Sequence, residues 1–512
     1  MGSVPAELHI PLTPLDHAPP GNYSCSLSYL PLQPGVSPKQ AFQLLQEGLH
    51  RTFVQLPWVA GRVWPQTPGT PGYRPGQLEI RYSPVDSHGP RPYQIKFNEL
   101  KTTKTYDELK DEAFPTDSFP DESLIWAPFM PDINKGPEVL VAQANFIPGA
   151  CLLTAGMYHK ATDGIGGVRI FTLWAEHCRA LQFPGPGELP TPVPPGPASM
   201  DRSLLDKTWA KEQTGKSVEE IDPGNWRLLG LAPPSASTPT PDSAEEDDAA
   251  PAPVEKVNGD AKEEPQPEET RTLKSAIFYV PPRKFVALQR ECAKGGDGIS
   301  GTDAIVALIW RCVLKARAKA ARQSGKTTGD ITNPDALSIL AVTVDGRPYF
   351  SSSLPPDYMG NLTCINLSAM PLSALTSPET GLPAVARTIR DGANSVTTAN
   401  LLDAYALARS VPDFAHLSLQ NASLDSTTLL VSPLLTYPTN LLSFGDELFG
   451  NGGFVEALRM PMYSFNRMTR LCLVLPKLAA GGVEFLLNLF EEEMDVFLKD
   501  PEFKKYAMFL AN

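Results

Sequence analysis

The sequence predicts an α/β (α+β) protein built from two domains with mixed β-sheets. Helix-like and strand-like patterns alternate irregularly along the chain, as expected for mixed sheets covered by helices. The length of 512 residues corresponds to two or three domains of ordinary size. Proline contributes 53 of these residues, about twice its usual share of ~5%, which argues against a continuous helical bundle or solenoid.

Two helices and one hairpin are predicted in the N-terminal half. Ser37-Pro38 has the residues of a helix N-cap and first turn. The apolar positions that follow recur every three or four residues up to Pro57, at Phe42, Leu45, Leu49, Phe53 and Leu56. Residues 138–158 have the pattern of two buried strands around a Pro148-Gly149 turn. Residues 166–181 then favour a second helix.

In the C-terminal half, strands and helices again alternate. Thr302 is the predicted N-cap of a helix that runs to about Arg322, and its basic end suits a helix C-terminus. The other predicted elements are a strand at 273–280, a strand at 337–344, a hairpin of 471–475 with 483–489, and a final helix at 491–499.

Residues 232–270 separate the two halves. This stretch is rich in proline and alanine and carries 11 acidic and 2 basic residues, a composition that cannot bury enough apolar surface to fold. We therefore expect an N-terminal domain at 1–182, a crossover linker at 183–270 that contains this disordered insertion, and a C-terminal domain at 271–512.

Composition and charge exclude several classes of protein. The net charge is −13, but outside residues 232–270 the chain is nearly neutral and has no basic face for nucleic acid. The seven cysteines form no CxxC pair, which indicates reduced thiols in a cytoplasmic protein and no metal site. The first residues have neither a basic nor an apolar leader region, and no stretch reads as a membrane span.

One segment has the pattern of a reactive site. His159 follows the predicted hairpin, and Asp163-Gly164 form the turn before the next helix. Reactive groups in α/β proteins commonly lie at strand ends that face a crevice, and a neutral histidine can accept a proton. A histidine followed by an aspartate is also common for purely structural reasons, so the local pattern leaves both interpretations open.

Other signals do not meet their requirements. Gly215-Lys216 and Gly325-Lys326 resemble the end of a phosphate-binding loop, but Ala210 and Ala320 replace its first glycine. The chain has no G-x-S-x-G sequence for an acyl-serine route. Cys151 is better interpreted as a small buried residue than as a nucleophile.

An ordered set of motifs resembles the BAHD acyltransferases, and in particular their fungal branch that includes trichothecene 3-O-acetyltransferase. HKATDG at 159–164 matches the HxxxDG motif of that family. Four further segments resemble the family in the same order, namely LTPLDHAPPGNYS at 12–24, LPWVAGRV at 56–63, ISGTDAIVALIWRC at 299–312 and VDGRPYFSSSLPPDYMGN at 344–361. Apart from the acidic insertion, the resemblance extends from about residue 10 to the C-terminus.

The resemblance implies two domains like chloramphenicol acetyltransferase with a channel between them. His159 would act there as the general base, while Asp163 and Gly164 would support the turn and Asp163 would pair with Arg347. Asn361 would line the channel or form a turn. The family implies acyl-CoA as co-substrate, most commonly acetyl-CoA, with no permanently bound cofactor, and a monomeric protein.

The sequence departs from the family near the C-terminus. The family motif DFGWG corresponds here to LLSFGDELFG at 441–450, so Ser443 replaces the aspartate and Asp446 is a nearby alternative. Ser432-Pro433 stands where many relatives have Ser-Trp. The departure affects the C-terminal loop and the acceptor pocket more than the chemistry at His159.

The expected function is transfer of an acyl group from acyl-CoA to a hydroxyl of a small secondary metabolite, without a covalent acyl-enzyme. Three alternatives stay open, namely an N-acyltransferase, a condensation-type enzyme that forms amides, and a non-catalytic binding protein on the same scaffold. Condensation domains use HHxxxDG, whereas Tyr158 precedes His159 here.

Deletion of residues 235–268 is expected to leave turnover within a few-fold of the full chain, because this composition contributes no packed core. The measurement is thiol release by the purified deletion variant beside the full-length protein. Complete loss of soluble activity would show that the segment does more than connect.

Overall fold

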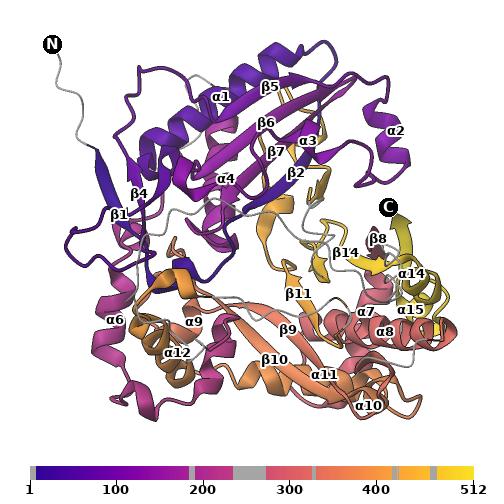
Figure 1. Ribbon diagram of the computed structural model, residues 1–512. Coiled ribbons are helices and arrows are strands. Elements are labelled where there is room, and N and C mark those ends of the chain that lie inside the picture. Colours follow the sequence, from indigo (N-terminus) through magenta and orange to yellow (C-terminus); the bar gives the residue numbers. More distant parts are fainter. Residues whose placement is uncertain are drawn as a thin grey trace, which may run out of the picture.

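The computed structural model describes residues 7–183, 191–233, 273–325, 330–417, 424, 426–461 and 470–512. Two large β-sheets lie in the two halves of the molecule, with helices packed against each (Figure 1). The α/β prediction with mixed sheets is therefore confirmed. The predicted insertion at 232–270 lies outside the described residues, except for its first two positions.

The N-terminal sheet has five strands in the order β12-β2-β7-β6-β5. Its strands are β2 (Tyr23–Pro31), β5 (Ile95–Glu99), β6 (Leu140–Ile147), β7 (Ala150–Tyr158) and β12 (Ala457–Arg459). Strands β6 and β7 form the predicted hairpin, and Gly149 in its turn has a φ of +86° that favours glycine. Because β5 runs parallel to β6, the sheet is mixed.

Helices α1 (Pro38–Gln55) and α4 (Gly164–Leu181) pack against each other in this half. They approach closely at Gly48, where an added Cβ would lie 2.4 Å from the Cys178 sulfur. The Trp174 indole donates a hydrogen bond of 2.8 Å to the Leu45 carbonyl across the same contact. The structure confirms both predicted helices, although α4 begins two residues earlier than expected because Asp163 is its N-cap.

A small three-stranded sheet and several short helices complete the N-terminal half. The sheet has the order β1-β4-β3. The short elements are β1 (Leu8–Pro11), η1 (Pro14–His17), η2 (Pro57–Ala60), β3 (Arg62–Pro65), β4 (Leu78–Tyr82), α2 (Tyr106–Asp111), α3 (Asp121–Leu124) and η3 (Ile133–Lys135).

The C-terminal sheet has seven strands in the order β10-β9-β11-β13-β14-β8-β15. The strands are β8 (Leu273–Val280), β9 (Leu337–Asp345), β10 (Thr363–Pro371), β11 (Leu429–Pro433), β13 (Leu471–Val474), β14 (Val483–Phe490) and β15 (Met508–Ala511). Strand β11 is parallel to both its neighbours, and the other pairs are antiparallel. The predicted strands at 273–280 and 337–344 and the predicted hairpin are confirmed.

Helix α8 (Gly301–Gln323) is the central helix of this half and is buried over most of its length. Its N-cap is Ser300, two residues before the predicted cap Thr302. The Ser300 hydroxyl accepts from the Asp303 amide at 3.2 Å, and the Asp303 carboxylate accepts from the Ser300 amide at 2.6 Å. This reciprocal capping box satisfies two amides that a cap at Thr302 would leave free.

The remaining helices of this half contact α8, the sheet, one another or, for some of them, elements of the N-terminal half. They are α7 (Pro282–Cys292), η6 (Ala293–Gly295), η7 (Asp330–Thr332), α9 (Arg347–Phe350), α10 (Leu372–Thr376), α11 (Leu382–Asn394), α12 (Thr398–Ser410), η8 (Phe414–His416), η9 (Pro438–Leu441), η10 (Asn451–Gly453), α14 (Glu491–Phe497) and α15 (Pro501–Tyr506). The predicted final helix at 491–499 is therefore α14, which ends two residues early.

The described part of the predicted linker is folded. It contains α5 (Pro197–Met200), α6 (Leu204–Glu212), η4 (Val218–Glu220) and η5 (Pro223–Leu229). Figure 1 shows α6 beside α9 and α12 of the C-terminal half, where the Trp209 indole donates to the Leu402 carbonyl at 3.1 Å. Conversely, β12 lies within the C-terminal half in sequence but pairs with β2 of the N-terminal sheet. The two halves therefore share elements.

Substitution of Arg459 by Met is expected to lower the free energy of unfolding by about 3–5 kcal/mol, because it breaks a buried ion pair. Arg459 on β12 is 2% exposed. It donates to the Phe114 carbonyl at 2.8 Å in the N-terminal half and to Glu484 on β14 at 2.7 Å. Urea denaturation followed by circular dichroism measures the change.

The matched control is Lys274→Met, which breaks the solvent-exposed Lys274–Glu491 pair of the same C-terminal sheet. An exposed pair is worth about 0–1 kcal/mol. Equal losses in the two variants would contradict the role given to Arg459.

Candidate active site

His159 is held at the end of a fully buried central strand of the N-terminal sheet. Strand β7 is buried along its whole length and pairs with β2 on one side and β6 on the other. The His159 amide, one residue past the strand, still donates to the Asn22 carbonyl at 2.9 Å. The backbone of the predicted base is therefore fixed by the sheet.

The turn after His159 is closed by Asp163 and Gly164. One Asp163 carboxylate oxygen accepts from the amides of Ile165 at 3.1 Å and Gly166 at 3.2 Å, which caps α4. Gly164 lies against Tyr437 of the C-terminal half, and an added Cβ would lie 2.8 Å from the Tyr437 hydroxyl oxygen. Glycine at this position therefore permits a close contact between the two halves.

Asp163 and Arg347 form a buried ion pair between the halves, as the family resemblance implies. The guanidinium donates to Asp163 at 2.9 Å, and both side chains are 1% exposed. Arg347 also donates to the Tyr358 and Gly360 carbonyls, and the Leu362 amide donates to the second oxygen of Asp163 at 3.0 Å.

This environment keeps Asp163 ionised. Burial by itself raises the pKa of its carboxyl group, but the Arg347 charge and the backbone amides outweigh burial and hold the pKa below its ordinary value. Both oxygens of Asp163 are engaged by these partners, so the carboxylate supports the turn.

Asn361 is buried rather than exposed. It is 2% exposed, and its side-chain amide donates to the His159 carbonyl at 2.9 Å. The same amide and the Asn361 backbone donate to one oxygen of Asp16, at 3.0 and 2.9 Å. Asn361 was expected to line the channel or to form a turn. The observed contacts show instead that its side chain binds the backbone of His159.

Asp16 and Arg202 belong to this site and were not identified from the sequence. Asp16 is fully buried and pairs with Arg202 at 2.9 Å. Arg202 also donates to the Ala161 carbonyl, inside the turn at residues 159–163. The sequence of residues 13–16 is typical of a capping box. The partners of Asp16 lie far away in the sequence, however, so no local sequence pattern points to them.

His159 is partly exposed as a residue. Its Nδ1 atom is buried without a hydrogen-bond partner in the part of the chain that the structure describes, so Nε2 is the nitrogen available to a ligand. Burial lowers the pKa of His159 below its ordinary value, although Asp163 partly opposes this shift. The imidazole is therefore neutral at physiological pH, as a general base requires.

Lys160 fixes the segment that precedes the site. Its ammonium donates to the carbonyls of His17 at 2.8 Å and Pro19 at 2.9 Å. Burial lowers the pKa of Lys160 to about 8. Its positive charge also favours the neutral form of His159.

The C-terminal loop that departs from the family motif folds around Ser443. The Ser443 hydroxyl donates to the Gly452 carbonyl at 2.8 Å and accepts from the Gly445 amide at 3.2 Å. Asp446 is exposed, so it does not take an interior position. Gln182, at the end of α4, accepts from the Glu447 and Leu448 amides and so binds the loop to the helix that Asp163 caps.

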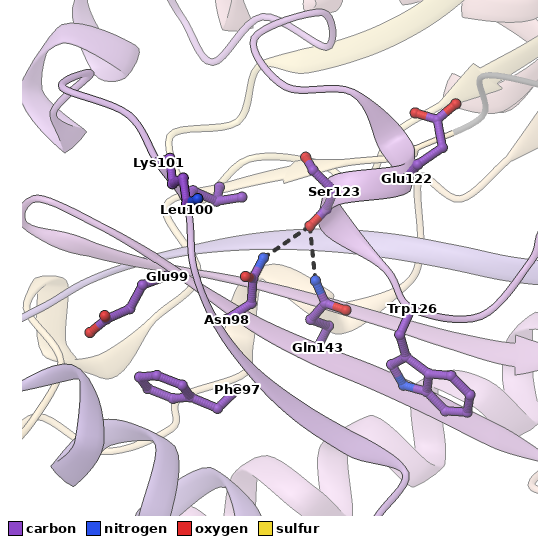
Figure 2. A pocket seen from close by; sticks show the side chains of 9 residues that line it. All are labelled: Phe97, Asn98, Glu99, Leu100, Lys101, Glu122, Ser123, Trp126 and Gln143. Atoms are coloured by element: carbon purple, nitrogen blue, oxygen red, sulfur yellow. Dashed lines mark hydrogen bonds between the residues drawn. The ribbon is translucent and has the colours of Figure 1, made fainter.

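A hollow of about 500 Å³ lies beside strand β5, away from the catalytic turn (Figure 2). Its lining includes Phe97, Trp126 and the amides of Asn98 and Gln143, both of which donate to the Ser123 carbonyl. Because both amides are engaged by the Ser123 carbonyl, we assign this hollow no role in the site at His159.

One group of metal-ligating types occurs among the described residues, although the sequence indicated none. Cys312, Asp500 and Glu502 bring their ligand atoms within 4.8 Å of one another. The Lys315 ammonium contacts both carboxylates, at 2.7 and 3.2 Å. The positive charge of Lys315 therefore already balances the negative charge of this group. Among the same described residues, no helix has the length and apolarity needed to cross a membrane.

The two-sheet fold of this chain is shared with a solved fungal protein. Over 98% of this chain, the structure superposes on the whole of TRI101 from F. sporotrichioides, solved with coenzyme A and T-2, with a TM-score of 0.72 and 20% identity. A family model described as the trichothecene 3-O-acetyltransferase-like N-terminal domain matches residues 25–178.

The chain belongs to the Transferase family, whose model matches residues 203–504. The eremophilane O-acetyltransferase ORF8 of Penicillium roqueforti is 26% identical and is matched over 98% of both chains. The isocyanide synthase-NRPS hybrid crmA of Aspergillus fumigatus is 31% identical over 97% of this chain. This chain spans only 31% of crmA and 47% of another curated relative.

Substitution of Asp163 by Asn is expected to lower the free energy of unfolding by about 3–5 kcal/mol, because it leaves the Arg347 charge buried without its main partner. Thermal or urea denaturation measures the loss. The matched control is Asp345→Asn, which removes the other carboxylate on Arg347, at 2.8 Å but 34% exposed.

The control should cost about 1 kcal/mol or less, since solvent screens that pair. A larger loss in Asp345→Asn than in Asp163→Asn would contradict the importance of the buried pair.

Proposed function

We propose that this protein transfers an acyl group from acyl-CoA to a hydroxyl of a small molecule, with His159 as the general base. The observation that carries the proposal is a partly exposed His159 at the end of β7, with a lowered pKa and with Nδ1 as its buried nitrogen, which leaves Nε2 as the nitrogen for a ligand. The match to the Transferase family and to a relative named as an O-acetyltransferase supports the same chemistry.

In this mechanism, His159 Nε2 removes the proton of the acceptor hydroxyl as its oxygen attacks the thioester carbonyl. The new C–O bond forms, the C–S bond breaks, and the imidazolium returns its proton to the departing coenzyme A sulfur. General base catalysis of this kind contributes about 10²–10⁴-fold. Holding both substrates beside one ring contributes further through proximity.

Cys151, at the opposite end of the strand that leads to His159, is unsuited to a covalent route. Cys151 lies on β7, fully buried, and burial raises the pKa of its thiol far above the ordinary range. A thiolate is the form that attacks a thioester. Direct transfer between the two substrates therefore fits the site better than an acyl-enzyme.

We propose acetyl-CoA as the donor and a hydroxylated secondary metabolite as the acceptor. Support comes from ORF8, named an eremophilane O-acetyltransferase, and from the fold shared with TRI101, which was solved with coenzyme A and T-2. The two substrates would meet at His159 in a channel between the halves.

A second candidate is transfer to an amine, and the similarity to the crmA hybrid favours it. At 31% identity, that relative is named for an isocyanide synthase and a peptide synthetase rather than for an O-acetyltransferase. A panel of alcohols and amines assayed at equal concentration separates the two candidates, because each acceptor yields a product of different mass.

Replacement of His159 by Ala is expected to lower kcat by about 10²–10⁴-fold, since the base is lost. Release of coenzyme A thiol from acetyl-CoA in the presence of an acceptor measures the rate. The control is His416→Ala, whose side chain is 59% exposed and should leave the rate unchanged. Full activity without His159 would overturn the mechanism.

The pH dependence follows from the pKa of His159, which burial holds below the ordinary value. Because the neutral ring is the active form, kcat/KM should rise with pH through this pKa. The midpoint of this rise should lie below about pH 6.5, the ordinary value for histidine, as measured by a pH profile of thiol release.

A further inference from the structure

Several buried polar atoms near His159, including Oδ1 of Asn22, lack partners among the described residues. Two of them are Nδ1 of His159 and the side-chain oxygen Oδ1 of Asn361, the residue whose amide nitrogen donates to the His159 carbonyl. A buried polar atom without a hydrogen bond is costly, and such atoms in folded proteins usually mark a functional position or a missing partner. One of these atoms can donate a proton and the other can only accept one.

The orientation of the Asn361 amide is fixed by its other contacts. Its nitrogen, Nδ2, donates one hydrogen to Asp16 at 3.0 Å and lies 2.9 Å from the His159 carbonyl oxygen. Both partners are acceptors only, so the reversed amide would place oxygen against oxygen. Oδ1 must therefore remain the free atom of this side chain.

Asp16 is itself held in place from several directions. One oxygen accepts from Arg202 at 2.9 Å, and the other accepts from the amide and hydroxyl of Thr13, both at 2.8 Å. Asp16 is fully buried, and Arg202 is 6% exposed. The carboxylate that orients Asn361 thus has little freedom to move.

Asp163 is not available to orient the ring, because its oxygens bind Arg347 and the backbone amides that close the turn. Asn361 is in contact with His159. Burial is the main influence on the pKa of His159 and lowers it, while the backbone of His159, the Asp163 charge and, least of the three, the Asn361 side chain raise it. The amide therefore affects the protonation of the ring, although Oδ1 of Asn361 and Nδ1 of His159 are not hydrogen-bonded to each other in this structure.

We propose that Asn361 is the positioning residue for the His159 imidazole, accepting the Nδ1 hydrogen on Oδ1 while Asp16 and Arg202 lock the amide. This contact would hold the neutral ring with its proton on Nδ1 and leave the Nε2 lone pair facing the substrates. The inference rests on the proposed function only for its effect on turnover, since the tautomer is a property of the free protein.

The tautomer is measured first, in the unmodified protein. Protein labelled with ¹⁵N-histidine is studied by NMR at pH 8, and the His159 signals are identified by their absence from His159→Ala. The expected result is a neutral ring protonated at Nδ1. A ring protonated at Nε2 would overturn the proposal, whether or not any substrate has been found.

The variant Asn361→Ala removes the acceptor. It is expected to give a mixture of tautomers and to lower kcat by about 10²–10⁴-fold, with KM for acetyl-CoA changed by less than about 3-fold. A purely structural loss would instead reduce the folded fraction and leave the tautomer of the remaining folded protein unchanged, and that result would overturn the proposal.

Asn366→Ala is the matched control. Asn366 lies on β10, is also 2% exposed and also has an unpartnered Oδ1, but its amide nitrogen faces the Ile389 carbonyl of α11. Its removal should leave the His159 tautomer and kcat within about 3-fold of the original. Equal effects of the two variants would contradict a specific role for Asn361.

If the His159 carbonyl rather than Asn361 holds the Nδ1 hydrogen, Asn361→Ala will retain the Nδ1 tautomer, and the proposal fails. If the unmodified protein shows the Nδ1 tautomer but releases no thiol with any acceptor, the proposed function fails while the positioning by Asn361 is retained.

Discussion

The buried ion pair between Asp163 and Arg347 is the interaction on which the site depends. It joins residues 184 positions apart, and on each side it organises a turn. Asp163 caps α4 and closes the loop after β7, while Arg347 gathers the Tyr358 and Gly360 carbonyls next to Asn361. Burying either charge without the other would strongly destabilise the fold. The turn at residues 159–163 and the second half are therefore assembled as one unit.

Around this pair, the residues that hold the turn in place differ from the residue proposed to act as the base. Asp163 has no oxygen left for the imidazole, and the ring is the one group of the HKATDG segment that combines partial exposure with a neutral base at ordinary pH. Lys160 and Arg202 donate to backbone carbonyls, and Arg202 also pairs with Asp16. The charged side chains around His159 are thus engaged by other groups of the protein.

The local parts of this arrangement could be predicted from the sequence. The hairpin, the turn and α4 follow from apolar spacing and from turn residues that are neighbours in the chain. The N-cap of α8 was misplaced because Ser300 and Thr302 are both good caps, and only Asp303 at the third helical position decides between them. The crossover helix α6 was missed because proline-rich segments flank it and its packing partners lie in α12. Asp16 and Arg202 could not be found, since their partners are brought together only by the tertiary fold.

The exchange of elements between the halves has a consequence for synthesis of the chain. Strand β2 ends at Pro31, but β12, which covers its outer edge, is complete only at Arg459. At the usual translation speed of about 5–20 residues per second, that edge stays open for roughly 20–90 s on the ribosome. An unpaired edge is a site for association with other chains, so a nascent polypeptide of this kind benefits from chaperones until its last quarter emerges.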